Sequence, residues 1–364
     1  MTRDYSKFTL PSATAPAAPR AWSMTEEMGW QPFFSQQLDL DDLHRTPPVR
    51  VTQVHRSALH VVGDAVEMDI PTLRDVTVGD WLLLDRDQPG QSRVLDRKSL
   101  LQRRAPGTER QMQLIAANID TVFIVSSCNP DFNVARMERY IALCFEAEIT
   151  PVIVLTKSDL SEDVADYVAQ AAAISDLVPV IALDARSGDP KTRLAEWCKP
   201  GKTVAFLGSS GVGKSTLTNA LAGGEEIETG AIRENDAKGR HTTTRRELHL
   251  VPGGCVVLDT PGMRELQLAD VAAGIDEVFA DLAALAESCR FRDCQHQSEP
   301  GCAVQAALAS GQVDAARLYR WRKLVAEEAF NSASVSERRM KDRAFGKMVK
   351  RAMKQKNRGR RDGG

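Results

Sequence analysis

The segment Gly208–Ser215 (GSSGVGKS) constrains the fold of this chain more than any other feature. It fits the pattern G-x-x-x-x-G-K-[ST], follows the apolar run Thr203–Leu207 and precedes a helical run, Lys214–Ala222. In such a strand–loop–helix unit, backbone N–H groups converge on the phosphates of a nucleotide at the N-terminus of the helix. We expect phosphate contacts from Gly208, Ser209, Ser210, Gly211, Val212, Gly213, Lys214, Ser215 and Thr216. Lys214 should reach the β- and γ-phosphates, and Ser215 should ligate Mg²⁺.

The chain around this loop alternates between strands and helices from about residue 110. Thr121–Ser126 reads as a buried strand and Val134–Glu148 as an amphipathic helix, and further strands and helices follow in the same alternation. This pattern is typical of right-handed βαβ units that form a mainly parallel sheet. The fold class of the central region is therefore α/β.

Two further motifs select the base. Thr156-Lys157-Ser158-Asp159 ends an apolar run and is similar to the N/T-K-x-D guanine motif. In that motif the carboxylate accepts hydrogen bonds from the N1–H and N2 amino group of guanine, which adenine does not present in that pattern. Asp259-Thr-Pro-Gly262 looks like the D-x-x-G motif, in which Asp259 would hold Mg²⁺ through a water and the Gly262 N–H would contact the γ-phosphate. We expect GTP rather than ATP as the ligand.

The motifs run in circularly permuted order. In Ras-like GTPases the phosphate loop comes first, whereas here Lys157 precedes Lys214 and Asp259 comes last. The same sheet can form when a chain is cut and rejoined, because domain termini often lie close together. The fifth GTPase motif, usually Ser-Ala, reads Asp184-Ala185. That departure leaves the contacts of this motif open.

The first switch is expected at Gly239–Thr244 (GRHTTT). Thr243 should complete the Mg²⁺ coordination, with Thr242 and Thr244 as alternatives. Met263 stands where Ras-like enzymes have a water-orienting glutamine, so intrinsic hydrolysis should be slow until a partner completes the site, which can be worth roughly 10³–10⁵ in rate. His241 is a candidate catalytic residue that positions water, and it could equally be a switch-loop histidine that contacts rRNA.

The N-terminal part has a different pattern. Short β-rich runs separated by turn signals fill residues 48–103 and predict a small barrel of about five strands. An OB-fold is one such barrel and often binds RNA, and an SH3-like barrel has nearly the same signature. Residues 1–44 read as a flexible arm, in which Trp22, Trp30, Phe33 and Phe34 could anchor a part.

Three of the seven cysteines cluster with a histidine near the C-terminus. Cys289, Cys294, His296 and Cys302 supply three thiolates and one imidazole, the donor set of a closed tetrahedral zinc site. An odd number of cysteines in a cytosolic chain also argues against a disulfide framework. We therefore expect one structural Zn²⁺ per chain, with the alternative of buried cysteines beside a surface histidine.

Charge and hydropathy indicate the compartment and the class of partner. Residues 338–364 hold 12 Lys/Arg and 2 Asp/Glu on a chain whose net charge is only −2, so a basic tail extends from an acidic body. Such a tail favours a polyanion, most often nucleic acid. Neither a secretory signal nor an apolar run long enough to span a membrane is present, so we expect a cytoplasmic protein without membrane contact. No heptad pattern suggests oligomers, and a monomer is expected.

These features together resemble the RsgA (YjeQ) family of small ribosomal subunit biogenesis GTPases, over about residues 48–330. The resemblance rests on the permuted order, on Val78-Gly79-Asp80-Trp81, on His241–Thr244 and on Cys294-Gln-His296-Gln-Ser-Glu-Pro-Gly-Cys302. It implies an N-terminal OB-fold, a circularly permuted GTPase domain and a C-terminal zinc domain. It also implies 16S rRNA as a partner and GTP hydrolysis stimulated by the small (30S) subunit late in that subunit's maturation.

The expected division is an arm at 1–44, an OB-fold RNA-binding domain at 45–105, a GTPase domain at 110–275, a helical zinc-binding domain at 276–337 and a basic tail at 338–364. Two other classes of function compete with a GTPase switch. One is a plain RNA-binding assembly protein in which the nucleotide is structural, and the other is a metabolic P-loop kinase. The guanine motif and the lack of a recognisable substrate lid argue against the kinase.

Overall fold

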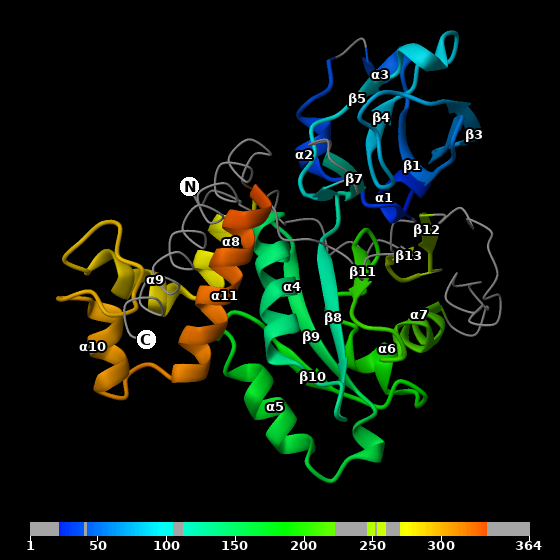
Figure 1. Ribbon diagram of the computed structural model, residues 1–364. Helices are drawn as coiled ribbons and strands as arrows, with labels where there is room; N and C mark the ends of the chain where they lie inside the picture. The colour runs from blue at the N-terminus through cyan, green and yellow to red at the C-terminus, as the bar shows by residue number, and fades with distance from the viewer. Residues whose placement is uncertain are drawn as a thin grey trace, which may run out of the picture.

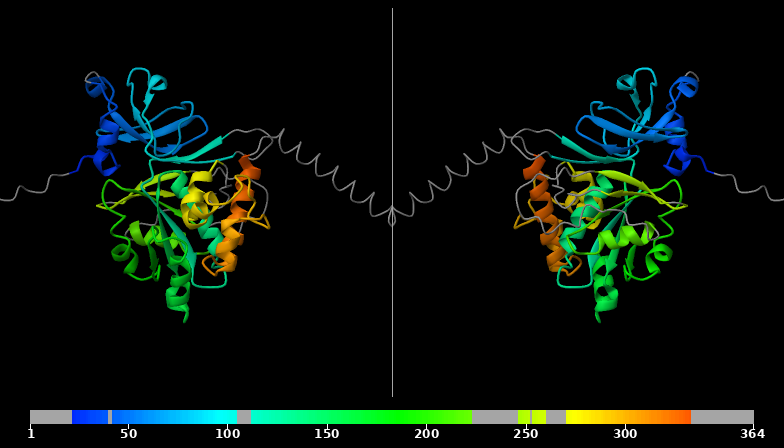
Figure 2. Two further views of the ribbon diagram at one scale, coloured as in Figure 1. Left: turned by 90° about the vertical axis from the view of Figure 1, so that its left-hand side faces the viewer. Right: turned by 90° about the vertical axis from the view of Figure 1, so that its right-hand side faces the viewer.

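The computed structural model describes residues 22–39, 42–104, 112–222, 246–251, 253–259 and 270–332. These residues form an N-terminal antiparallel β region, a central mixed α/β sheet and a C-terminal group of helices (Figure 1). The two side views in Figure 2 show the β region above the central sheet and the C-terminal helices packed against one side of it.

The N-terminal β region is a Greek key. Its strands are β1 (Pro48–Val54), β2 (Ala58–Gly63), β3 (Val66–Pro71), β4 (Trp81–Leu83) and β5 (Arg93–Val94). All pairings are antiparallel, and β1 lies between β2 and β4, which gives the spatial order β4-β1-β2-β3. That order defines a Greek key, the arrangement on which the OB-fold is built. Alternate residues such as Leu59 and Val61 point into a buried core, as the apolar runs predict.

A separate hairpin follows. Strands β6 (Leu100–Arg104) and β7 (Met112–Ala117) pair only with each other within the described residues. The sequence analysis did not predict them, and the expected boundary between residues 105 and 110 falls between the two paired strands. The hairpin contacts the central sheet where Arg246 donates a hydrogen bond to the carbonyl of Leu114 at 2.7 Å.

The central sheet has the order β10-β9-β8-β11-β13-β12. Its strands are β8 (Thr121–Ser127), β9 (Thr150–Thr156), β10 (Val180–Ala182), β11 (Thr203–Leu207), β12 (Glu247–Leu250) and β13 (Val256–Asp259). All neighbours are parallel except β12, which is antiparallel to β13 and also meets β1 through the pair Gln53 and Glu247. Parallel strands covered on both faces are continuous apolar runs, as in Val152–Leu155, where every residue is fully buried.

Helices cover both faces of this sheet. Helices α4 (Val134–Glu146) and α5 (Val164–Ala172) lie on one side, and α6 (Asp189–Arg193) and α7 (Lys214–Ala222) lie on the other (Figure 1). Asn133 caps α4, since its side chain accepts the N–H of Arg136 at 2.9 Å. Helix α6 has Pro190 in its first turn, a position where proline is favoured because its missing N–H needs no partner there.

The C-terminal helices are α8 (Ala272–Val278), α9 (Ala280–Glu287), α10 (Ala303–Ala309) and α11 (Ala315–Ser332). Helix α8 packs so closely on α4 that a Cβ atom at Gly274 would lie 2.0 Å from the carbonyl oxygen of Ala142. Helix α11 adds two ion pairs to α4: Arg320 with the fully buried Glu138 at 2.9 Å, and Glu327 with Arg139 at 2.5 Å. Among the described residues no helix is long and apolar enough to cross a membrane.

The expectation of a flexible arm at 1–44 is wrong for residues 22–39. They contain α1 (Met24–Glu27), begun by a capping box at Ser23, and α2 (Pro32–Ser35). Phe34 is 1% exposed and packs with Trp30 and Trp81, at ring-centroid distances of 5.6 Å and 5.8 Å. Burial of these aromatic rings stabilises the helices of residues 22–39. The low-complexity composition of the preceding residues gave no sign of this. A third short helix, α3 (Asp42–Arg45), leads into β1.

Arg50, on β1, joins these parts. Its side chain is fully buried and donates to the carbonyls of Met28, Gly79 (3.3 Å) and Asn118 (3.0 Å) and to the hydroxyl of Thr203 (2.8 Å). Burial lowers the pKa of the guanidinium to about 10, although Asp120 and Asp80 raise it, so the group is charged at neutral pH. The guanidinium of Arg50 therefore links four parts of the chain: the N-terminal helices, the barrel, the turn at Asn118 between β7 and β8, and the start of β11.

Substitution of Arg50 by methionine should lower the free energy of unfolding by about 3 kcal/mol, because four buried acceptors lose their donor. Urea unfolding of purified protein measures this change. Arg56→Met, at an exposed position of the same barrel, is the control and should change stability by less than about 0.5 kcal/mol. Equal stability of the two variants would contradict the role assigned to Arg50.

Candidate functional site

The phosphate loop begins where β11 ends. Gly208 follows Leu207 with φ +148°, and a Cβ atom on it would lie 2.3 Å from the carbonyl oxygen of Val125 on β8. A residue with a side chain therefore cannot replace Gly208 without displacing β8. The loop continues to α7, whose first residue is Lys214.

Lys214 folds back over the loop. Its ammonium group donates to the carbonyl of Gly208 at 2.9 Å and to the carbonyl of Ser209. Ser215 is half-buried and Thr216 exposed, both in the first turn of α7. The Lys214 ammonium and the N-terminus of α7 thus bring positive charge to the same loop, which is the arrangement that binds phosphate groups.

The guanine motif meets this loop. Thr156 is the last residue of β9, and its hydroxyl lies 2.6 Å from the carbonyl oxygen of Val212 and 3.2 Å from that of Ser126. This threonine therefore connects two motifs that are far apart in sequence. Lys157 has φ +57°, a left-handed conformation that turns the chain into the short 3₁₀ helix Ser158–Leu160, where Asp159 is exposed.

Arg136 is a residue of this site that the sequence analysis missed. It lies in the first turn of α4, donates from Nη1 to the hydroxyl of Ser209 and also pairs with Asp131 at 3.1 Å. The available signal was a basic residue in the first turn of the helix after β8, the strand beside β11. No sequence motif marks that proximity.

The remaining predicted residues are partly described. Asp259 ends β13, whereas its side chain, Gly262, His241 and Thr243 lie outside the described residues. In the fifth motif, the carboxylate of Asp184 accepts the N–H of Arg186 at 2.8 Å, and the Ser187 hydroxyl donates to the Asp184 carbonyl at 2.9 Å. The Asp184 side chain thus stabilises its own turn.

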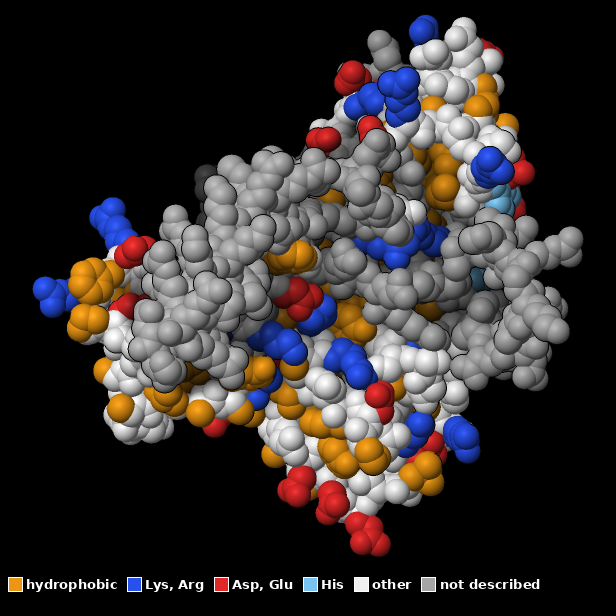
Figure 3. Space-filling view, in the orientation of Figure 1, with side chains coloured by type: hydrophobic (Ala, Val, Ile, Leu, Met, Phe, Trp, Pro, Cys, Tyr) orange, Lys and Arg blue, Asp and Glu red, His pale blue; other side chains and the backbone are white. Residues whose placement is uncertain are grey.

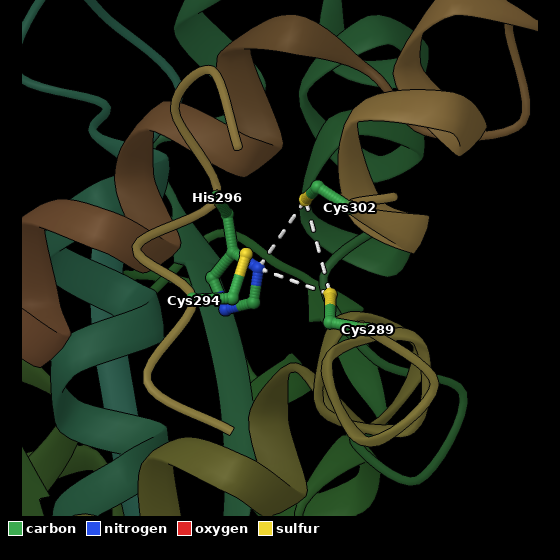
Figure 4. A group of neighbouring side chains, drawn as sticks. All are labelled: Cys289, Cys294, His296 and Cys302. Carbon is green, nitrogen blue, oxygen red and sulfur yellow. Dashed lines mark hydrogen bonds between the residues drawn. The ribbon is translucent and has the colours of Figure 1, made fainter. Parts of the chain in front are cut away.

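The cysteine–histidine cluster lies between α9 and α10 (Figure 4). The Sγ atoms of Cys289 and Cys302 are 3.8 Å apart, and Nδ1 of His296 is 3.5 Å and 3.6 Å from them. With Cys294, the four donor atoms lie within 4.8 Å of one another. Tetrahedral zinc with Zn–S bonds of about 2.3 Å needs sulfur atoms roughly 3.8 Å apart. The cluster therefore suggests a zinc site, and its donors fit the ion.

Hydrogen bonds outside the cluster shape its loop. The carboxylate of Glu299 accepts the backbone N–H groups of Gln295, Gln297 and Ser298, and these bonds lower the pKa of Glu299 to about 2. Gln305 donates to the carbonyl of His296 at 2.6 Å. The imidazole also packs on the ring of Trp321 at 5.2 Å, so α11 supports the cluster.

Thr156→Val should loosen the phosphate loop, because the carbonyl of Val212 loses the hydroxyl that holds it. We expect a loss of about 1 kcal/mol in the free energy of unfolding and faster amide exchange in residues 208–213. Hydrogen–deuterium exchange of that peptide measures the effect. Thr150→Val, at the exposed start of the same strand, is the control. Identical exchange in both variants would show that the hydroxyl does not hold the loop.

Comparison with known proteins identifies the family. The family described as RsgA GTPase matches residues 94–269. Small ribosomal subunit biogenesis GTPase RsgA 2 of Vibrio parahaemolyticus is 50% identical over 334 residues, covering 91% of this chain and 93% of the relative. RsgA of Mesorhizobium japonicum is 51% identical over 314 residues, covering 84% of this chain and 90% of the relative.

Solved structures agree with these relatives. The crystal structure of YjeQ from Thermotoga maritima is 28% identical, with a TM-score of 0.57 over 77% of this chain and 98% of that one. YloQ, described as a circularly permuted GTPase, is 22% identical with a TM-score of 0.54 over 80% of this chain and 97% of that one, a similarity of fold. Because half of its residues are identical to those of RsgA proteins along nearly their full length, the chain belongs to the RsgA family of GTPases.

Proposed function

We propose that this chain hydrolyses GTP as an assembly factor of the small ribosomal subunit, which it binds through 16S rRNA and which stimulates its turnover. The observation that carries the nucleotide part is the hydrogen bond between Thr156 and Val212, which brings the guanine motif against the phosphate loop. The role of the RsgA relatives in biogenesis of the small ribosomal subunit supports the ribosomal part.

The nucleotide would lie across the carboxyl ends of β9, β11 and β13. The exposed carboxylate of Asp159 is available to the base, and the stem of Lys157 would pack over the ring. The amides of Gly208–Thr216 and the ammonium of Lys214 would hold the phosphates, with Asp259 and Gly262 at the γ-phosphate. Ser215 and Thr243 would ligate Mg²⁺, which neutralises charge on the β- and γ-phosphates when bound.

Hydrolysis by the free protein should be slow. Met263 has no polar group that orients water, and His241 is the residue that we assign to this task. Docking on the subunit would order the site and place His241, so that turnover occurs only on the correct partner. The protein would thus act as a switch in the cytoplasm, binding the immature subunit with GTP and leaving after hydrolysis.

Two regions would contact rRNA. The first is the barrel together with the hollow where it meets the sheet, in which basic side chains gather (Figure 3). Acidic side chains collect at the opposite tip of the central region. The second region is the basic tail at residues 338–364. A basic surface favours a phosphate backbone, and the attraction weakens with salt.

The ion of the cysteine–histidine cluster would be one structural Zn²⁺, held by Cys289, Cys294, His296 and Cys302. All four positions of a tetrahedron would then be filled by protein, which leaves no open position for catalysis. The ion would tie the end of α9 to Cys302, the residue that caps α10.

Comparing GTP with ATP, with and without purified small subunits, tests the function. Wild-type protein should hydrolyse GTP slowly alone and at least about 100-fold faster with subunits, and ATP in neither case. Stimulation of only twofold would favour the alternative of an RNA-binding protein with a structural nucleotide.

Asp159→Asn is the matched variant for this assay. It should lose about 100-fold or more in GTP affinity, because the amide cannot accept both guanine donors. Affinity should return with xanthosine triphosphate, since xanthine carries a carbonyl where guanine has its amino group. Unchanged GTP affinity would remove Asp159 from the site.

Metal analysis of purified protein should find about one zinc per chain. Cys302→Ala should abolish zinc binding and increase amide exchange across residues 288–302, because ligation and folding are coupled. Cys198→Ala, outside the cluster, should keep the metal. A wild-type protein without zinc would refute the assignment.

A further inference from the structure

Arg136 connects α4 to the phosphate loop. Its Nη1 atom donates to the hydroxyl of Ser209 and lies 3.1 Å from the carboxylate of Asp131, and within the described part of the chain the guanidinium makes no other hydrogen bond. The side chains of Arg136 and Asp131 are 35% and 42% exposed. An ion pair this exposed adds little to stability, so fold stability does not explain the arrangement.

The helix that carries Arg136 is itself held firmly. One turn further along, Glu138 and Arg139 pair with Arg320 and Glu327 of α11. On the same helix, Ala142 contacts Gly274 backbone to backbone. Arg136 therefore extends from a support that the C-terminal helices fix, and it contacts a loop that Thr156 and Lys214 also hold.

We infer that Arg136 is a positioning residue for GTP hydrolysis, acting through Ser209; this inference rests on the proposed nucleotide site. Charge on the phosphate oxygens is redistributed in the transition state. The N–H groups of the loop stabilise this charge only if they already point to the oxygens that carry it. Ser209 carries the first N–H after Gly208, whereas Thr156 contacts the loop at Val212, three residues further along. Arg136 fixes the loop at Ser209.

The shape of arginine suits this task. A planar fork can donate to a carboxylate and a hydroxyl at the same time in a fixed geometry, whereas an ammonium is a flexible point charge. The carboxylate of Asp131 and the hydroxyl of Ser209 both accept from Nη1 of Arg136, so Asp131 holds the guanidinium against the loop. A shift of about 1 Å in groups that position a substrate can cost about 100-fold in rate.

Steady-state kinetics with small subunits and GDP binding by fluorescence test the inference. Arg136→Met and Ser209→Ala should each lower kcat about 10- to 100-fold, with less than about threefold change in GDP affinity. The double variant should be no slower than the slower single variant, because both substitutions remove one contact. Arg136→Lys should recover part of the loss, since it keeps the charge.

Arg193→Met is the control. It lies at an exposed position in the last turn of α6, on the opposite face of the central sheet, and should retain wild-type kcat. Turnover of Arg136→Met within twofold of wild type, or losses that multiply in the double variant, would overturn the inference. Ser209→Ala leaves the ion pair between Arg136 and Asp131 intact, so this variant tests the inference even if Arg136→Met folds poorly. Absence of GTP hydrolysis in wild-type protein would instead refute the proposed function.

Discussion

A buried positive charge at Arg50 sets the arrangement of the described structure. A guanidinium removed from water must be surrounded by acceptors, and those acceptors come from four segments of the chain: Met28, Gly79, Asn118 and Thr203. Asp120 adds a charge nearby, and although burial alone would raise its pKa, hydrogen bonds from Lys98 and the Thr203 N–H lower it. The barrel, its N-terminal helices and the strand that leads to the phosphate loop therefore share one hydrogen-bonded centre.

The order of the strands explains how a permuted chain keeps a working site. Side-by-side packing of β9, β8, β11 and β13 brings their carboxyl ends to one edge, wherever the chain is cut. Thr156 then reaches Val212 across that edge, and Arg136 reaches Ser209 from α4. The permutation moves the chain ends, so that the next elements along the chain after β13 are α8 and the helices around the cysteine–histidine cluster.

Local patterns predicted much of the fold and supplied the candidate residues of the site. The phosphate loop, the guanine motif and the cysteine–histidine spacing lie within short stretches whose chemistry depends on neighbours in sequence, and the strands of the barrel and sheet follow apolar runs. Contacts between distant residues could not be predicted in this way. Arg50 and Thr203 are 153 positions apart, and Arg136 and Ser209 are 73 apart. Burial of Phe34 depends on Trp81, so composition misjudged residues 22–39. The hairpin β6–β7 was missed as well, although its strands are neighbours in the sequence and, within the described residues, pair with each other.

Gly274 lies against Ala142 without room for a single methyl group. A contact between two backbones has no rotamers to rearrange, so it cannot absorb a displacement in the way that interleaved side chains do. Helices α8 and α4 should consequently move together as one rigid unit. A displacement of α8 would therefore be passed on to α4, the helix whose first turn holds Arg136 against the phosphate loop.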